Sequence, residues 1–317
     1  MGFIIAGIII IVVAAALLVF TYITYRIAFY SPKNRKENIY DFPEGSDFAS
    51  AKQVMTKWID EVKDRPCEEV EITSFDGLKL RGRYYHIQDG APIHIQFHGY
   101  RGTAFRDFSG GNRMAREMGH NNLLIDQRAH GKSEGRTISF GINERRDCLA
   151  WAKYAADRFG ENTELYLSGV SMGATTVLMA AGLDLPKNVK GIIADCPFSS
   201  PEKIIKKTIK EMGFSLKFAF PFVALGARIF GKFNVREATA QEAVKKARVP
   251  ILLLHGETDT VVPYEMSREV YESSPEKITF STFPEAGHAM SYVVDPVRYE
   301  KAVKEFFAKT SKFVTKK

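Results

Sequence analysis

The first segment of the chain has no charged or polar side chain from Phe3 to Phe20, and its apolar character continues to Ile23. A helix rises about 1.5 Å per residue, so this run is long enough to cross a hydrocarbon core about 30 Å thick. Aromatic residues of the kind found in interfacial belts follow it: Tyr22, Tyr25, Phe29 and Tyr30. The pattern predicts a transmembrane helix that anchors the protein within residues 1–30.

A cleaved signal peptide is the alternative interpretation of this segment. Such a peptide has Lys or Arg before a shorter apolar core and a small-residue cleavage site after it, and none of these features is present here. We therefore favour a retained, single-pass anchor. Basic residues follow the apolar run, and the positive-inside tendency then favours a cytoplasmic location for the domain after it, although large domains can also be translocated: Arg26, Lys33, Arg35 and Lys36.

A different pattern begins after residues 31–66, which we interpret as a polar linker with a short helix near residues 55–62. Short alternating or continuous apolar runs, typical of strands, are then separated by stretches with helical periodicity. Asp76-Gly77 predicts a hairpin turn between the first two strands. The predicted strands are residues 70–74, 79–86, 93–97, 122–125, 164–170, 189–194, 249–254 and 278–283, and the predicted helices are residues 105–118, 144–159, 172–183, 264–272 and 296–308.

This alternation predicts one α/β domain over residues 67–317, with an eight-stranded, mostly parallel sheet and helices on both of its faces. About fifty residues, roughly 199–247, separate the sixth and seventh strands, which is more than a single crossover helix needs. We expect this insertion to form a helical lid over the active site, with an ordinary pair of packing helices as the alternative.

The composition of the insertion supports this interpretation. Isoleucine and lysine recur in residues 203–210 with the spacing of an amphipathic helix that has a basic face. Seven basic and two acidic residues lie between Pro201 and Phe233, a balance that suits an anionic membrane surface. The second half of the insertion is rich in phenylalanine: Phe214, Phe218, Phe220, Phe222, Phe230 and Phe233.

The composition of the whole chain fits a globular protein, with 45% hydrophobic and 26% charged residues among 317. Cys67, Cys148 and Cys196 are odd in number and far apart, so we expect neither a disulfide framework nor a structural zinc site. The net charge is +7, but no basic run dominates and no nucleic-acid-binding motif is present. We therefore expect no nucleic-acid partner. The oligomeric state stays open.

Gly169-Val170-Ser171-Met172-Gly173 lies between the predicted strand 164–170 and the predicted helix 172–183. A G-x-S-x-G sequence alone occurs by chance, but between a strand and a helix it indicates a sharp turn that exposes the serine above the sheet edge. Ser171 is therefore the candidate nucleophile.

A serine nucleophile needs a base and an orienting acid, which follow it in the order acid, then histidine. Asp259 comes after strand 249–254, and His288 comes after the last strand. The carboxyl ends of parallel strands meet at one edge of a sheet, so Ser171, Asp259 and His288 are expected to lie together. Asp195 and Glu257 are the alternative acids.

A tetrahedral intermediate needs two N–H donors. We expect the backbone N–H groups of Met172, directly after the nucleophile, and of Tyr100, in the loop 98–103, to supply them. His98 is interpreted as a structural hydrogen-bonding residue. The polar segment 126–133 fits no metal-ligand or phosphate pattern, so we interpret it as a loop that braces the sheet edge.

Five motifs appear in a characteristic order: H-G-Y, D-Q-R-A-H-G-K-S, G-V-S-M-G, H-G-E-T-D-T-V-V-P and A-G-H. Together they resemble the α/β-hydrolase superfamily over residues 70–307, and most closely its anchored or peripheral esterases, lipases and acyl-protein thioesterases. The resemblance implies a catalytic triad of Ser171, Asp259 and His288, with Tyr100 and Met172 as oxyanion donors. It also implies the strand order 1-2-4-3-5-6-7-8 with strand 2 antiparallel.

The expected function is hydrolysis of a carboxylic ester or thioester through an acyl-enzyme on Ser171, without a cofactor or a metal. The anchor and the phenylalanine-rich insertion favour a small-molecule or lipid-like acyl substrate. A peptidase or amidase and an acyltransferase are alternatives, because the same triad serves several reactions. An alternative of another class is a catalytically idle, membrane-bound interaction protein.

Overall fold

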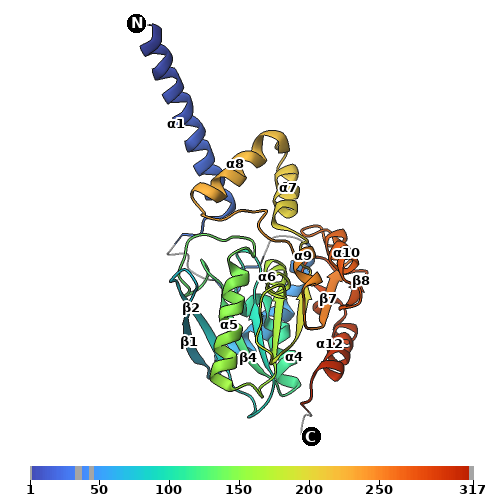
Figure 1. Ribbon diagram of the computed structural model, residues 1–317. Coiled ribbons are helices and arrows are strands. Elements are labelled where there is room, and N and C mark those ends of the chain that lie inside the picture. The colour runs from blue at the N-terminus through green and yellow to red at the C-terminus, as the bar shows by residue number, and fades with distance from the viewer. Residues whose placement is uncertain (1, 33–37, 43–45, 314–317) are drawn as a thin grey trace.

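The computed structural model describes residues 2–32, 38–42 and 46–313 (Figure 1). Its strands are β1 (Glu68–Thr73), β2 (Lys79–Tyr85), β3 (Ile93–Phe97), β4 (Asn121–Asp126), β5 (Leu165–Val170), β6 (Val189–Asp195), β7 (Ile251–Gly256) and β8 (Ile278–Phe283). Its helices are α1 (Gly2–Ala28), α2 (Ser46–Lys63), α3 (Ala104–Asp107), α4 (Ser109–Glu117), α5 (Glu144–Phe159), α6 (Met172–Ala180), α7 (Pro201–Glu211), α8 (Leu216–Ile229), α9 (Ala240–Lys245), α10 (Tyr264–Ser273), α11 (Ser291–Val294) and α12 (Pro296–Thr310).

The eight strands form one sheet in the order β1-β2-β4-β3-β5-β6-β7-β8. β2 is antiparallel to both of its neighbours, and the pairs from β4 to β8 are parallel. Every residue of β3, β4 and β7 is buried, as expected for parallel strands that are covered by helices on both faces. The predicted sheet, including its strand order, is confirmed.

Alternate residues of the central strands enter two different cores, because successive side chains of a strand point to opposite faces. Leu253 of β7 packs in the cluster that contains Trp151 of α5. Leu252 and Leu254 pack in the cluster that contains Phe306 of α12. Helices therefore cover both faces of the sheet, as predicted.

Two predicted helices differ most from the structure. The predicted helix 105–118 is two helices, α3 and α4, because Phe108 leaves the helical conformation with φ −112° and ψ 19°. Gly110 and Gly111, which are weak helix formers, follow this break. A Cβ atom on Gly110 would lie 2.3 Å from the Tyr292 ring, so this glycine is required by packing that periodicity does not reveal. The predicted short helix 55–62 belongs to the longer α2.

α1 is long and apolar enough to cross a membrane, and its side chains are exposed over most of its length. Its C-terminal end differs, because Thr21 and Tyr25 are buried and Phe29, directly after the helix, is fully buried. The Phe29 ring lies 5.8 Å from the Phe140 ring and 5.1 Å from the Phe233 ring. The end of the predicted anchor is therefore packed into the core of the α/β domain.

Backbone hydrogen bonds fix the chain at the same place. Ser31 N–H donates to the Arg136 carbonyl over 2.9 Å, and Ile138 N–H donates to the Phe29 carbonyl over 2.8 Å. The Tyr25 hydroxyl and the Thr137 hydroxyl are 2.8 Å apart. The orientation of α1 relative to the domain is thus set by specific contacts and not by a flexible tether.

We expect Phe29→Ala to destabilise the protein by about 3–5 kcal/mol, because it leaves a cavity where a fully buried ring packs against two others. Thermal unfolding of the full-length protein in detergent micelles measures the change. Phe3→Ala is the matched control, since Phe3 lies on the same helix and is 96% exposed. Equal unfolding temperatures for the two variants would contradict the packing role of Phe29.

Candidate active site

Ser171 occupies a sharp turn between β5 and α6, with φ +55° and ψ −117°. Non-glycine residues rarely adopt such a conformation, and it persists only where the surroundings enforce it. A Cβ atom on Gly169 would lie 2.3 Å from the Gly173 carbonyl carbon, and one on Gly173 would lie 1.7 Å from the Phe97 carbonyl oxygen. Both flanking positions therefore require glycine, and the turn presents the Ser171 side chain at the carboxyl edge of the sheet.

Three side chains from distant segments form a continuous line at this edge. His288 Nε2 lies 3.0 Å from Ser171 Oγ, and His288 Nδ1 lies 2.7 Å from Asp259 Oδ2. The Asp259 side chain is fully buried, whereas the His288 side chain is 13% exposed. These are the distances and the order that a nucleophile, a general base and an orienting acid require.

The Asp259 carboxylate is held on both of its oxygens. Oδ1 accepts hydrogen bonds of 2.8 Å from the N–H groups of Val261 and Val262. Burial raises the pKa of Asp259, but the hydrogen bonds from His255 and His288 outweigh burial, and the pKa lies well below its usual value. Asp259 is therefore ionised at neutral pH, where it can orient His288 and stabilise its charged form.

Asp195 and Glu257, the two alternative acids, are placed differently. Glu257 is exposed at the surface. Asp195 is buried, and one of its carboxylate oxygens has no hydrogen-bond partner among the described residues. Burial raises the pKa of Asp195 to about 6, although the charge of His255 opposes this rise. Of the three acids, Asp259 is the one whose carboxylate contacts His288.

The raised pKa of Asp195 predicts a pH-dependent effect of Asp195→Asn on stability. Between the usual pKa of 3.8 and about 6, the folded protein retains a proton that the unfolded chain has lost, so this carboxyl destabilises the wild type as pH rises through that range. Asp195→Asn removes this penalty, so the stability of the variant relative to the wild type should rise by roughly 2 kcal/mol between pH 4.5 and pH 7.5. Thermal unfolding of both proteins at pH 4.5 and 7.5 measures it. A difference that does not change with pH would refute the assignment.

Two backbone segments flank Ser171 where oxyanion donors are expected. Met172 is the first residue of α6, and the first N–H groups of a helix have no partner within the helix. On the other side, a Cβ atom on Gly99 would lie 3.4 Å from Ser171 Cβ. The loop that contains Tyr100 is thus packed directly against Ser171, as the predicted role of the Tyr100 N–H requires.

A hydrogen-bond network braces this loop. Asp107 Oδ2 accepts from Gly99 N–H over 2.8 Å, and His98 Nε2 accepts from Gln127 N–H over 3.1 Å. The N–H of Arg101 donates to His130 Nε2 over 3.1 Å. The segment 126–133 therefore braces the loop after β3, and His98 is part of the network, as predicted.

Asp107 also positions this loop, a role that was not predicted from the sequence. Burial raises the pKa of Asp107, but the adjacent Arg106 guanidinium outweighs burial and lowers the pKa below its usual value. The ionised carboxylate then holds the Gly99 backbone beside Ser171. No motif marks this residue, because its role arises from the way the short helix α3 folds back over the loop.

The end of α1 also contacts the loop. The Tyr100 hydroxyl donates to the Ala28 carbonyl over 2.9 Å, and the Arg101 guanidinium donates to the Ile27 carbonyl over 2.9 Å. The last carbonyl groups of a helix lack partners within the helix, so these donors satisfy them. The long apolar helix α1 and the loop beside Ser171 are therefore directly linked.

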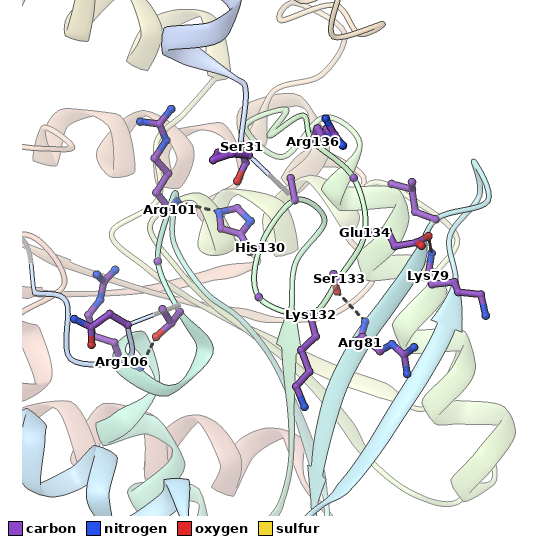
Figure 2. Close-up of a pocket in the computed structure, with 18 of the residues that line it drawn as sticks. Ser31, Lys79, Arg81, Arg101, Arg106, His130, Lys132, Ser133, Glu134 and Arg136 are labelled. Atoms are coloured by element: carbon purple, nitrogen blue, oxygen red, sulfur yellow. Dashed lines mark hydrogen bonds between the residues drawn. The ribbon is translucent and has the colours of Figure 1, made fainter. Parts of the chain in front are cut away.

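A cavity of about 560 Å³ lies on the other side of this loop, between the segment 129–136 and the start of β2 (Figure 2). Neither Ser171 nor His288 lines it. Six basic side chains line it, but most have acidic partners: Lys79 and Arg81 pair with Glu71, Arg106 with Asp107 and Lys132 with Glu69. We therefore assign no anionic ligand to it.

Cys196, Asp259 and His288 place potential metal-ligand atoms within 4.8 Å of one another. Burial raises the pKa of the Cys196 thiol well above its usual value, which opposes formation of the thiolate that binds metals. Both ring nitrogens of His288 are already hydrogen-bonded. These properties favour acid–base chemistry at this cluster.

Comparisons with known proteins agree with this site and fold. Residues 137–313, more than half of the chain, match the prolyl oligopeptidase family. The uncharacterised protein YqkD of Bacillus subtilis is 28% identical over 191 residues, which cover 60% of this chain and 63% of YqkD. The lysophosphatidylserine lipase ABHD12 of Danio rerio is 25% identical over 219 residues, 65% of this chain and 52% of the lipase. The chain thus spans less than two thirds of the length of either relative.

Among solved structures, the esterase Pf2001 of Pyrococcus furiosus superimposes with a TM-score of 0.64 at 24% identity. The superposition covers 77% of this chain and 91% of the esterase, and it establishes the common α/β-hydrolase fold. The family match, the sheet order and the turn at Ser171 lead to one assignment. The chain belongs to the prolyl oligopeptidase family of hydrolases.

Proposed function

We propose that the protein is a serine hydrolase that cleaves carboxylic ester or thioester bonds, with Ser171 as nucleophile, His288 as general base and Asp259 as orienting acid. The observation that carries this proposal is the position of His288, with Nε2 3.0 Å from Ser171 Oγ and Nδ1 2.7 Å from Asp259 Oδ2. The strained backbone of Ser171 supports it, because strain of this kind is concentrated at functional sites.

The proposed reaction has two halves. His288 Nε2 removes the Ser171 hydroxyl proton as Oγ attacks the acyl carbon, and the N–H groups of Met172 and Tyr100 stabilise the oxyanion. The C–O or C–S bond then breaks, and the leaving group takes the proton from His288. Water, deprotonated by the same His288, attacks the acyl-enzyme, and the acid is released as Ser171 regains its proton. Asp259 stays ionised and keeps the Nδ1–H of His288 oriented.

The similarities and the apolar helices bear on the substrate class. The lipase and esterase similarities favour an ester, and the apolar helix α1 with the phenylalanine-rich α8 favours an apolar acyl group. A peptidase or amidase is the second candidate, because the family that matches is named for prolyl oligopeptidase. An idle interaction protein would not need the complete line of contacts from Ser171 to Asp259.

A panel of substrates tests the proposal with the full-length protein in detergent micelles. It contains p-nitrophenyl esters of increasing chain length, acyl-thioesters and aminoacyl anilides. We expect ester or thioester cleavage to exceed anilide cleavage by at least about 100-fold in kcat/KM, since esters are the more reactive bonds. Preferential cleavage of the anilides would favour the peptidase or amidase alternative. If no member of the panel is cleaved, the alternative of an idle interaction protein is favoured.

We further propose that the catalytic domain lies in the cytoplasm, because basic residues follow the apolar run of α1. Cys67 is exposed, whereas Cys148 and Cys196 are buried. A membrane-impermeant maleimide should therefore label Cys67 only after the cells are permeabilised. Labelling of Cys67 in intact cells would place the domain outside.

A further inference from the structure

The insertion between β6 and β7 exposes an unusual number of large apolar side chains. Phe218 is 70% exposed, and its neighbours on α8 and on the turn before it are also exposed. We call the following residues the α8 apolar surface: Met212, Phe214, Leu216, Phe218, Leu225 and Ile229. Soluble proteins rarely expose a continuous patch of this kind, so it requires a partner.

α8 has three distinct faces, and two of them are occupied. Phe220, Val223 and Ala227 are buried against the core of the α/β domain. Phe218, Leu225 and Ile229, at spacings of seven and four residues, form a separate face that contacts no other part of the described chain closely enough to be buried.

The second occupied face packs on α1 (Figure 1). The Phe222 ring lies 4.9 Å from the Phe20 ring, and the Phe230 ring lies 5.0 Å from the Tyr22 ring. Gly226 lies at the crossing point, where a Cβ atom would be 2.9 Å from the Thr21 carbonyl oxygen. This close contact fixes the height of α8 along the membrane-spanning helix.

The position at which α8 crosses α1 corresponds to the boundary between the hydrocarbon core and the headgroups of a bilayer. Phe20 ends the uninterrupted apolar run of α1, and Arg26 follows six residues later, about 9 Å along the helix axis. Amphipathic helices that bind membrane surfaces sink about 5–10 Å into this same boundary. A bilayer that surrounds α1 therefore reaches α8 as well.

The charges next to the α8 apolar surface fit this position. Four cations are exposed there and have no ion pair with any acidic side chain that the structure describes: Lys210, Lys217, Arg228 and Lys232. By contrast, Lys203, Lys206 and Lys207 of α7 pair with Glu269, Glu202 and Glu211. Free cations beside an apolar face are suited to anionic lipid headgroups.

We propose that the α8 apolar surface is immersed in the lipid leaflet from which α1 emerges, and that acyl lipids reach the active site from this leaflet. The second half of this proposal rests on the proposed function. Ring contacts at the start of the insertion support this access route. The Phe198 ring, which follows β6, lies 6.1 Å from the Phe140 ring, and the Phe140 ring lies 4.9 Å from the Tyr100 ring. The start of the insertion and the loop beside Ser171 are thus connected by packed aromatic rings.

Fluorescence quenching tests the immersion without any measurement of activity. Phe218→Cys in a Cys67→Ser background is labelled with an environment-sensitive dye, and the full-length protein is reconstituted in vesicles of phosphatidylcholine and phosphatidylglycerol. We expect acyl-chain-brominated lipid to reduce its emission at least twofold, and aqueous iodide to have little effect. Glu161→Cys, an exposed position before β5 at the opposite edge of the sheet, is the control and should respond to iodide alone.

Two results would overturn the immersion. Quenching by iodide without quenching by brominated lipid would place the α8 apolar surface in water. Protection from both quenchers would show that another protein chain, such as a second copy, covers it.

Activity tests the access route. Phe218→Glu combined with Leu225→Glu should lower hydrolysis of a long-chain acyl ester in vesicles at least tenfold, while hydrolysis of a short, water-soluble ester stays within twofold. Val297→Glu on α12, where the valine is 78% exposed, is the matched control and should change neither rate. Equal losses on both substrates would overturn the access route. If the wild type cleaves neither substrate, the proposed function fails, and the quenching result still decides the immersion.

Discussion

Ser171→Ala should abolish labelling by a fluorophosphonate probe and lower kcat/KM for ester hydrolysis by about 10⁶-fold, the scale on which serine hydrolases lose activity without their nucleophile. The reason is geometric, since Ser171 Oγ is the oxygen 3.0 Å from His288 Nε2 at the edge of the sheet. Alanine keeps the Cβ atom, so the strained backbone with φ +55° meets no new contact and the fold should persist.

Ser168→Ala is the matched control for this experiment. Ser168 lies three residues earlier in β5, is buried, and has no hydrogen-bond partner for its hydroxyl among the described residues. Its loss should therefore leave labelling and activity within about threefold of the wild type. Undiminished labelling of the Ser171→Ala protein would show that another residue is the nucleophile.

Asp259→Asn should lower kcat by about 10⁴-fold while the protein stays folded. Asp259 Oδ2 receives the Nδ1 proton of His288, and its Oδ1 receives two backbone N–H groups, so the carboxylate fixes one tautomer of the imidazole. An amide in its place can turn its NH₂ group toward His288. Nε2 would then carry the proton and could no longer accept one from Ser171.

Asp195→Asn distinguishes this role from a general effect of buried acids near the site. Asp195 is the last residue of β6 and lies close enough to be influenced by His255 and His288, but its carboxylate makes no hydrogen bond with His288. We expect kcat to stay within about threefold of the wild type. A loss comparable to that of Asp259→Asn would show that both acids support the base.

Much of the fold was predictable from local pattern. Strand–helix alternation predicted all eight strands, because the alternation of buried residues within a strand and the amphipathic spacing within a helix depend on neighbouring residues. The turn at Ser171 was predictable because its G-x-S-x-G sequence lies between a predicted strand and a predicted helix, although the contact that requires Gly173 is with β3. The apolar run of α1 follows from composition alone.

The choice among candidate acids was not predictable in this way. Asp195, Glu257 and Asp259 all lie at the end of a strand or shortly after it, at the same edge of the sheet. The sequence alone does not show which of them contacts His288. Asp107 carries no motif, and Gly110 is required by the ring of Tyr292, far along the chain.

Local sequence pattern was thus enough to predict the strands, most of the helices, the turn at Ser171 and the apolar anchor, because these features depend mainly on residues that are close along the chain. The tertiary structure decided which acid meets His288, that Asp107 and the end of α1 brace the loop beside Ser171, and that α8 lies against α1. These are distances between segments that strand order and side-chain packing bring together, and no local periodicity records them.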